Sequence, residues 1–183
     1  MKRLGGKVAW VTGSSRGIGA AIARLFAREG ALVAVHGRDP EALSAVHAEI
    51  EKEGGRAIAV AGDLTKFAEV EAIRQQIERD LGAIDILVAN AGGSFTPPGP
   101  LEDMTEDGWR ASVEGNLTAT FLTIKSVLPG MKARKAGTIL TMSSSAAPAG
   151  RIPGRRSRTR PRRPASRSSR STWRPRSDRS VSE

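Results

Sequence analysis

Short apolar runs alternate with stretches of helical periodicity along most of the chain. The runs cover residues 7–12, 31–36, 56–61, 84–89 and 137–143. Their length and their content of Val, Ile and Ala predict buried strands, and the apolar residues between them recur at the spacing of helices with one buried face. This alternation predicts an α/β fold in which helices cover both faces of a doubly wound parallel sheet.

Capping and breaking residues locate the ends of the helices. Gly30 predicts the end of the first helix, and Asp39, which a proline follows, predicts the start of the second. Thr65 is expected to cap the third helix. A loop rich in Pro and Gly at 94–100 precedes a fourth helix, which we predict over residues 109–134.

The composition of the chain changes near residue 150. The net charge is +10, and residues 151–183 account for all of it, with 12 arginines against Asp178 and Glu183. Residues 1–150 balance 17 basic against 17 acidic residues and contain all the apolar runs. We therefore predict one folded domain at 1–150 and a disordered basic tail rich in Arg, Ser and Pro at 151–183.

Composition also excludes several functional classes. The chain has no cysteine, which excludes disulfides, Cys-ligated zinc and thiol nucleophiles. His36 and His47 lack the spacing and the acidic neighbours of a metal site, so we expect no metal and interpret both as surface or packing residues. No apolar run approaches the ~18 residues of a membrane span, and no signal peptide follows Met1, so we expect no membrane partner and a cytoplasmic location.

A glycine-rich turn with the sequence TGSSRGIG lies between the first predicted strand and the first helix. Glycines let the backbone approach a pyrophosphate closely, and a helix N-terminus offers unpaired N–H groups and a partial positive charge. An ordinary strand-to-helix turn is the alternative, but the strand–turn–helix context favours dinucleotide binding. The residues expected to bind the cofactor here are Thr12, Gly13, Ser15, Arg16, Gly17, Ile18 and Gly19.

Four further motifs follow this turn in order along the chain. They are Asp63-Leu64, Asn90-Ala91-Gly92-Gly93, Asn116 within the long helix, and Ser143-Ser144-Ser145 after the fifth strand. Together with the turn they resemble the short-chain dehydrogenase/reductase family over residues 5–150. The resemblance implies a Rossmann-type fold, a nicotinamide cofactor, and hydride transfer between that cofactor and a small-molecule carbonyl or alcohol substrate. It also implies a homo-oligomer for an intact member. Because the charges of residues 1–150 balance, we expect no nucleic-acid partner for the folded domain.

The resemblance implies a role for each motif. The residues that would line the cofactor, with Asp63 at the adenine, are Asp63, Leu64, Asn90, Ala91 and Gly92; ordinary strand-end turns are the alternative. Asn116 would interrupt its helix and hold a water molecule for a proton relay, against the alternative of a helix residue that faces solvent. Ser144, with its two neighbouring serines as alternatives, would hydrogen-bond the substrate.

The choice between NAD(H) and NADP(H) depends on the residues that meet the adenosine ribose. An acidic residue at the end of the second strand would bind the ribose hydroxyls of NAD, but here the strand ends in His36-Gly37-Arg38, with no acid before Asp39. Arg38 and Arg16 offer planar guanidinium groups that suit a phosphate. We therefore expect NADP(H) rather than NAD(H), the alternative being that both arginines are solvated surface charges.

The sequence departs from the family pattern after residue 150. The family reaction needs a tyrosine that protonates the carbonyl oxygen and a lysine four residues later, but the chain contains no tyrosine and continues as RRSRTR from Arg155. Few residues of the tail are apolar, so we expect a fold truncated after the fifth strand and a chain that is inactive as written.

A shifted reading frame is one explanation of this tail. If each tail codon supplies the last two bases of the true codon, residues 158–183 can be read as YAAAKAGIEVLALDLAPEVGPVGVR. This reading restores the Tyr-x-x-x-Lys spacing and an amphipathic helix without a stop codon. We therefore hypothesise a one-base shift between about residues 149 and 157. The alternative is a natural tail on a cofactor-binding remnant, which would bind nucleic acid or another polyanion through salt-sensitive contacts.

Overall fold

A computed structural model of the protein describes residues 2–143. Ser144 and the predicted basic tail lie outside the described residues, so the predicted domain boundary at residue 150 stays a prediction. The elements are β1 (Val8–Val11), α1 (Gly17–Arg28), β2 (Leu32–Gly37), α2 (Pro40–Lys52), β3 (Arg56–Ala61), α3 (Phe67–Asp80), β4 (Ile86–Ala89), η1 (Leu101–Asp103), α4 (Glu106–Val113), η2 (Glu114–Thr118), α5 (Ala119–Arg134) and β5 (Thr138–Thr141).

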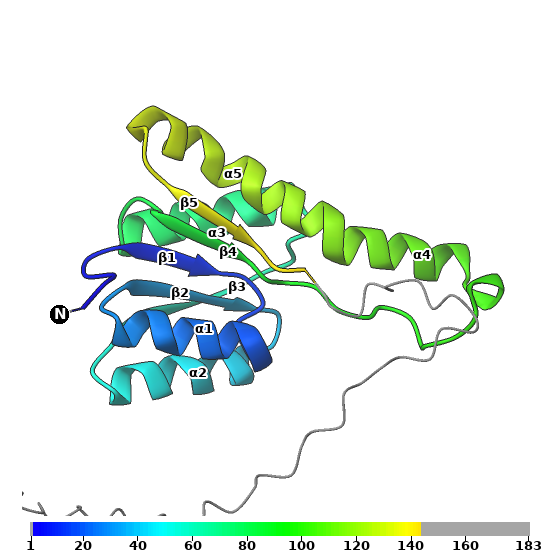
Figure 1. Ribbon diagram of the computed structural model, residues 1–183, viewed down its shortest axis with the longest axis horizontal. Helices are drawn as coiled ribbons and strands as arrows, with labels where there is room; N and C mark the ends of the chain where they lie inside the picture. Colours follow the sequence, from blue (N-terminus) through cyan, green and yellow to red (C-terminus); the bar gives the residue numbers. More distant parts are fainter. Residues whose placement is uncertain (1, 144–183) are drawn as a thin grey trace, which may run out of the picture. The chain divides into compact units, whose positions relative to one another are not determined.

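The strands form one parallel sheet in the order β3-β2-β1-β4-β5 (Figure 1). The chain builds outward from β1 through β2 to β3, and then returns to the other side of β1 for β4 and β5. This confirms the predicted doubly wound sheet with five strands. The order reverses between β1 and β4, and in such sheets ligands bind beyond the carboxyl ends of the strands at this point.

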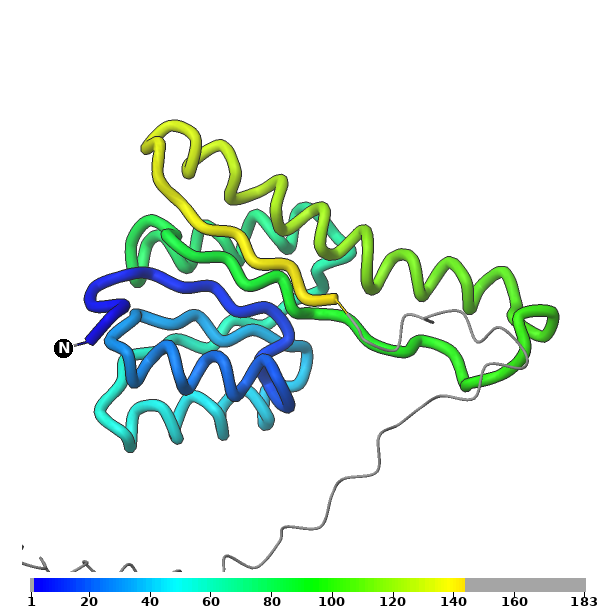
Figure 2. The backbone as a smooth tube through the Cα atoms, viewed as in Figure 1, coloured from blue at the N-terminus to red at the C-terminus, as the bar shows by residue number. Residues whose placement is uncertain are grey.

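Alternate residues of each strand point to two separate apolar layers. In β1, Val8 and Trp10 pack with α3 and α5, whereas Ala9 and Val11 pack with α1 and α2. Figure 2 shows these two helical layers on opposite sides of the strands. The face of α1 toward the sheet is lined by small side chains, those of Ala20, Ala23 and Ala27.

Two predicted helix starts are wrong, and in both a side-chain hydrogen bond explains the difference. The fourth helix begins at Glu106 rather than at 109, because the hydroxyl of Thr105 accepts a hydrogen bond from Gly108 N at 3.1 Å and caps it. Thr65 does not cap α3: its N–H and its hydroxyl both donate to Asp63 Oδ1, at 3.0 and 2.8 Å.

The predicted long helix is also interrupted. Five residues, Glu114–Thr118, form a π-helical turn between α4 and α5. Such turns occur mostly inside α-helices and are frequent at functional sites. The turn contains Asn116, and its backbone lies against the ring of Phe95, so a side chain at Gly115 would collide with that ring.

Strand β5 is the least buried strand of the sheet. Within residues 2–143 it pairs only with β4, and Leu140 in the strand and Met142 just after it are each 43% accessible. Over the same residues, no helix is long and apolar enough to cross a membrane.

Candidate functional site

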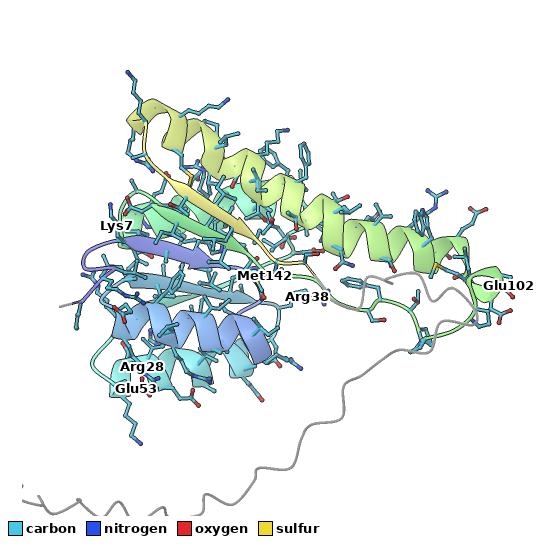
Figure 3. The ribbon with its side chains drawn as sticks, in the orientation of Figure 1. Lys7, Arg28, Arg38, Glu53, Glu102 and Met142 are labelled. Atoms are coloured by element: carbon cyan, nitrogen blue, oxygen red, sulfur yellow. The ribbon has the colours of Figure 1, made fainter. Side chains whose placement is uncertain are left out.

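A cavity of about 490 Å³ lies at the carboxyl ends of the strands. Figure 3 shows Arg38 and Met142 at this end of the sheet and Lys7 at the opposite end. Eight of the residues expected to bind a cofactor line the cavity: Gly13, Ser15, Arg16, Arg38, Asp63, Leu64, Ala91 and Gly92. They come from the turns after β1, β2, β3 and β4, so the sheet brings segments far apart in sequence to one edge.

The glycines of the first turn meet two different requirements. Gly13 has a φ of +63°, and a Cβ there would lie 2.8 Å from the Cα of Ala91. Gly19 has no space for a Cβ, which would collide with the carbonyl of Gly13 and the side chain of Asn90. Gly17, with a φ of +58°, faces open space at the first position of α1. Close packing therefore explains why Gly13 and Gly19 are glycines, whereas the open space at Gly17 leaves room for a ligand.

The start of α1 has unpaired backbone N–H groups. Its N-cap residue, Arg16, makes no side-chain capping bond, and the first turn contains no acidic residue. By contrast, Asp39 Oδ1 caps α2 by accepting from Ala42 N at 3.2 Å. An uncapped N-terminus carries a partial positive charge and free donors, which suit a bound phosphate group.

Thr12 and Asn90 hold the first turn against β4. Thr12 is 1% exposed, and its hydroxyl accepts from the N–H groups of Asn90 at 3.0 Å and Ala91 at 2.9 Å. The side-chain amide of Asn90 donates to the carbonyls of Thr12 and Gly13, at 3.0 and 3.1 Å. Neither residue is among those that line the cavity, and through these bonds both support the turn; their expected contact with the cofactor stays a prediction.

The two arginines expected at the adenosine ribose have different surroundings. Arg16 Nη2 forms an ion pair with Asp39 Oδ2 at 3.2 Å. Both carboxylate oxygens of Asp39 are therefore engaged, one by Arg16 and one by the start of α2. Arg38 forms no ion pair within residues 2–143, and its side chain is the free cation at this side of the cavity.

Asp63 is held as a carboxylate at the end of β3. The backbone N–H of Thr65 and then its hydroxyl lower the pKa of Asp63 below its ordinary value against an opposing effect of burial, and the charges of Lys66 and Arg38 lower it further. The N–H of Asp63 donates to Glu69 Oε2 at 2.7 Å. A fixed acceptor thus lines the same cavity as Arg38.

Asn116 links the π-helical turn to the segment after β4. Its Oδ1 accepts from Gly93 N at 3.0 Å, and its Nδ2 donates to Gly93 O at 3.1 Å and to Ser112 O at 2.9 Å. It is half-buried, and its amide is engaged by Gly93 and Ser112, unlike an ordinary helix residue that faces solvent. Ser143 is exposed after β5, and Ser144 lies outside the described residues. Ile18 is also exposed, at the start of α1.

His36 and Ser14 were not predicted as site residues from the sequence, nor were other residues that line the cavity, such as Phe95 and Gly115. His36 is 3% exposed, which leaves packing and excludes the surface alternative, and it lines the cavity at the end of β2. Ser14 is fully buried within the glycine turn. Their places, at the carboxyl end of a strand and inside the turn, were the available signals. No group of three or more His, Asp or Glu side chains in the described part of the chain could hold a metal ion.

Comparison with known proteins identifies the family. The sequence pattern of the family described as short chain dehydrogenase matches residues 7–154. The chain belongs to the short-chain dehydrogenase family. The match begins just before β1 and includes every cofactor-binding and catalytic residue expected from the sequence, from Thr12 to Ser144.

Relatives within the short-chain dehydrogenase family differ in substrate and cofactor. A 2,3-dihydro-2,3-dihydroxybenzoate dehydrogenase of Bacillus subtilis is 38% identical over 146 residues, which are 80% of this chain and 55% of the relative. A metagenomic short-chain oxidoreductase in complex with NADP is 42% identical, with a TM-score of 0.73 over 77% of this chain and 63% of that one. A 7α-hydroxysteroid dehydrogenase complexed with NADH and 7-oxo glycochenodeoxycholic acid is 40% identical, with a TM-score of 0.75 over 79% and 56%. The chain thus spans little more than half of the curated relative's length.

Proposed function

We propose that this chain binds NADP(H) in the cavity at the carboxyl ends of the strands. The observation that carries the proposal is the guanidinium of Arg38, which forms no ion pair within residues 2–143, together with the uncapped start of α1; the carboxylate of Asp39, the first acid after β2, is engaged by Arg16 and by the start of α2. A ribose phosphate would meet a cation at the end of β2, whereas the ribose hydroxyls of NAD would find no unengaged carboxylate at that strand end. The N–H groups at Gly17 and Ile18 would hold the pyrophosphate, and Asp63 and Leu64 would contact the adenine.

We further propose that the gene encodes a cytoplasmic reductase that transfers hydride between this cofactor and a small-molecule carbonyl or alcohol. The nicotinamide supplies the hydride when bound. Asn116 would hold a water molecule for proton transfer, and Ser144 would hydrogen-bond the carbonyl oxygen. The chain contains no tyrosine to donate the proton, so we expect it to bind the cofactor without catalysing the reduction.

Cofactor affinity tests the first proposal. Binding of NADPH and NADH to the full chain is measured by titration calorimetry, and NADPH is expected to bind more tightly. Arg38→Ala should weaken NADPH binding about tenfold or more and leave NADH binding nearly unchanged, because it removes a charge-assisted hydrogen bond to the phosphate. Arg56→Ala removes the same charge at the other end of the sheet and serves as the matched control. Equal affinity of both cofactors for the unchanged chain would contradict the NADP(H) assignment.

The reading frame decides the second proposal. The coding DNA across codons 145–165 is sequenced again, and a chain carrying the shifted reading YAAAKAGIEVLALDLAPEVGPVGVR is made in parallel. We expect NADPH-dependent reduction of a panel of ketones by the shifted chain and none by the printed chain. Robust turnover by the printed chain would refute the argument. If the printed chain instead binds polyanions, and loses that binding in high salt or on truncation after Gly150, the cofactor-binding remnant with a natural tail is the correct interpretation.

A further inference from the structure

His36 connects three strand ends through both nitrogens of its ring. At the end of β2, its Nδ1 accepts a hydrogen bond from Gly13 N at 3.3 Å, and its Nε2 lies 3.2 Å from Gly62 O. The partners fix the tautomer, because an N–H group can only donate and a carbonyl oxygen can only accept. The ring is therefore neutral, with its proton on Nε2, and it bridges the glycine turn after β1 to the end of β3.

The backbone around His36 strengthens this connection. Ser14 N donates to the carbonyl of His36 at 2.7 Å, and His36 N donates to the hydroxyl of Ser14 at 2.8 Å. The same hydroxyl donates to the carbonyl of Val11 at 2.7 Å. The glycine turn is thus tied to β2 through the backbone, and β2 is tied to β3 by their ladder and by Gly62 N, which donates to Gly37 O at 3.3 Å. The imidazole adds a direct side-chain bridge from the glycine turn to the end of β3.

The bridged segments lie on two sides of the cavity. Gly13 belongs to the turn proposed to hold the pyrophosphate, and Gly62 precedes Asp63, which is proposed to contact the adenine. We propose that His36 is a positioning residue that sets the spacing between the pyrophosphate and adenine sides of the cavity through Gly13 and Gly62. The inference rests on the proposed NADP(H) binding and adds the residue that controls its geometry.

Packing alone would make a different prediction for the same side chain. The ring also lies edge-on against Trp10, with centroids 6.5 Å apart and planes at 73°. If packing were its only role, Phe would replace it with little effect on ligand affinity, since phenylalanine keeps a flat ring of similar size. If His36 sets the spacing, the loss of both hydrogen bonds should weaken ligand binding.

Three substitutions separate the two hydrogen bonds. His36→Phe removes both, His36→Asn keeps an acceptor near the Nδ1 position for Gly13, and His36→Gln keeps a donor near the Nε2 position for Gly62. The matched control is His47→Phe. It removes another histidine contact to a backbone carbonyl, that of Nε2 with Ala57 O of β3 at 3.0 Å, and His47 does not line the cavity.

Affinities for NADPH and for the adenosine bisphosphate fragment of NADP are measured by calorimetry at a temperature where each variant is folded. We expect His36→Phe to weaken both ligands about tenfold, the loss of two hydrogen bonds, with smaller losses for His36→Asn and His36→Gln and none for His47→Phe. Unchanged affinity in the His36 variants would overturn the inference and leave the proposed function intact. If the Phe variant does not fold, unchanged binding by the Asn and Gln variants has the same meaning. Failure of the unchanged chain to bind either ligand would overturn both proposals.

Discussion

The buried imidazole of His36 predicts that acid destabilises this protein before its carboxylates are protonated. The pKa of His36 is lowered from its ordinary value of 6.5 to about 4, mainly by burial and to a smaller extent by the charge of Arg38, against opposing effects of the Gly62 carbonyl and Asp63. When the chain unfolds, the ring returns to water and to its ordinary pKa. Between pH 6.5 and about 4 the unfolded state therefore binds more protons, and the free energy of unfolding falls as the pH falls.

The size of this effect follows from the same two values. A pKa difference from 6.5 to about 4 corresponds to about 3 kcal/mol when the transition is complete, since one pKa unit is worth about 1.4 kcal/mol. At pH 5 about 2 kcal/mol of this stability should already be lost. That is a large share of the ~5–15 kcal/mol that stabilises a typical domain.

Denaturant unfolding followed by tryptophan fluorescence measures the effect at several pH values from about 7.5 to 5. This range avoids Glu29, Glu53 and Glu69, whose pKa values lie below their ordinary value of 4.5, so that the stability they contribute is lost only at lower pH. His36→Phe has no titrating ring and should lose the acid dependence. His47→Gln, which removes the other histidine, should keep it. A free energy that changes equally with pH in the unchanged chain and in His36→Phe would refute the assignment.

Three further substitutions test the supports of the site by thermal or denaturant unfolding. Gly19→Ala should destabilise the fold by about 1–3 kcal/mol, because its methyl group has no space in the turn. Gly99→Ala, where a Cβ would meet open space without a positive φ, is the control, and an equal loss in both would contradict the packing argument. Thr12→Val should lower the free energy of unfolding by about 2–4 kcal/mol, because the N–H groups of Asn90 and Ala91 lose their acceptor. An unchanged stability would mean that a water molecule takes the place of the hydroxyl. Asn116→Ala should lower the free energy of unfolding by about 1–2 kcal/mol, because the N–H and the carbonyl of Gly93 lose their partners. An unchanged stability would show that the π-helical turn does not depend on this amide.

The apolar pattern was sufficient to locate the strands because most of them are buried on both faces. Strand β3 begins and ends at the residues predicted from the pattern. Strand β4 begins later than predicted, at Ile86. Asp85 before it still bonds the neighbouring strand β1, because its N–H donates to Val8 O at 2.9 Å and its carboxylate accepts from Val8 N at 3.0 Å. Local capping decided the helix starts, and the hydroxyl of Thr65 had a nearer partner in Asp63 than the helix that follows.

The site was predictable where a residue type has one local meaning, as in the glycine turn and at the ends of the strands. It was not predictable where the role depends on a partner from another strand. The ring of His36 finds its partners 23 residues before it in the chain and 26 after it, and no local pattern indicates either. Likewise, the sequence shows Asp39 as the first acid after β2, but its engagement by Arg16 appears only in the folded chain.

Three alanines on the buried face of α1 determine how close the helix lies to the sheet, and so where its first turn is placed at the cavity. A methyl side chain at Ala20, Ala23 and Ala27 lets the helix lie close to the strands, and interiors packed at this density yield little when a larger group is inserted. A bulkier residue at Ala23 would lift the helix and carry its first turn away from the cavity. Substitutions at these three alanines would therefore lower ligand affinity in a binding screen, although none of the three side chains lines the cavity.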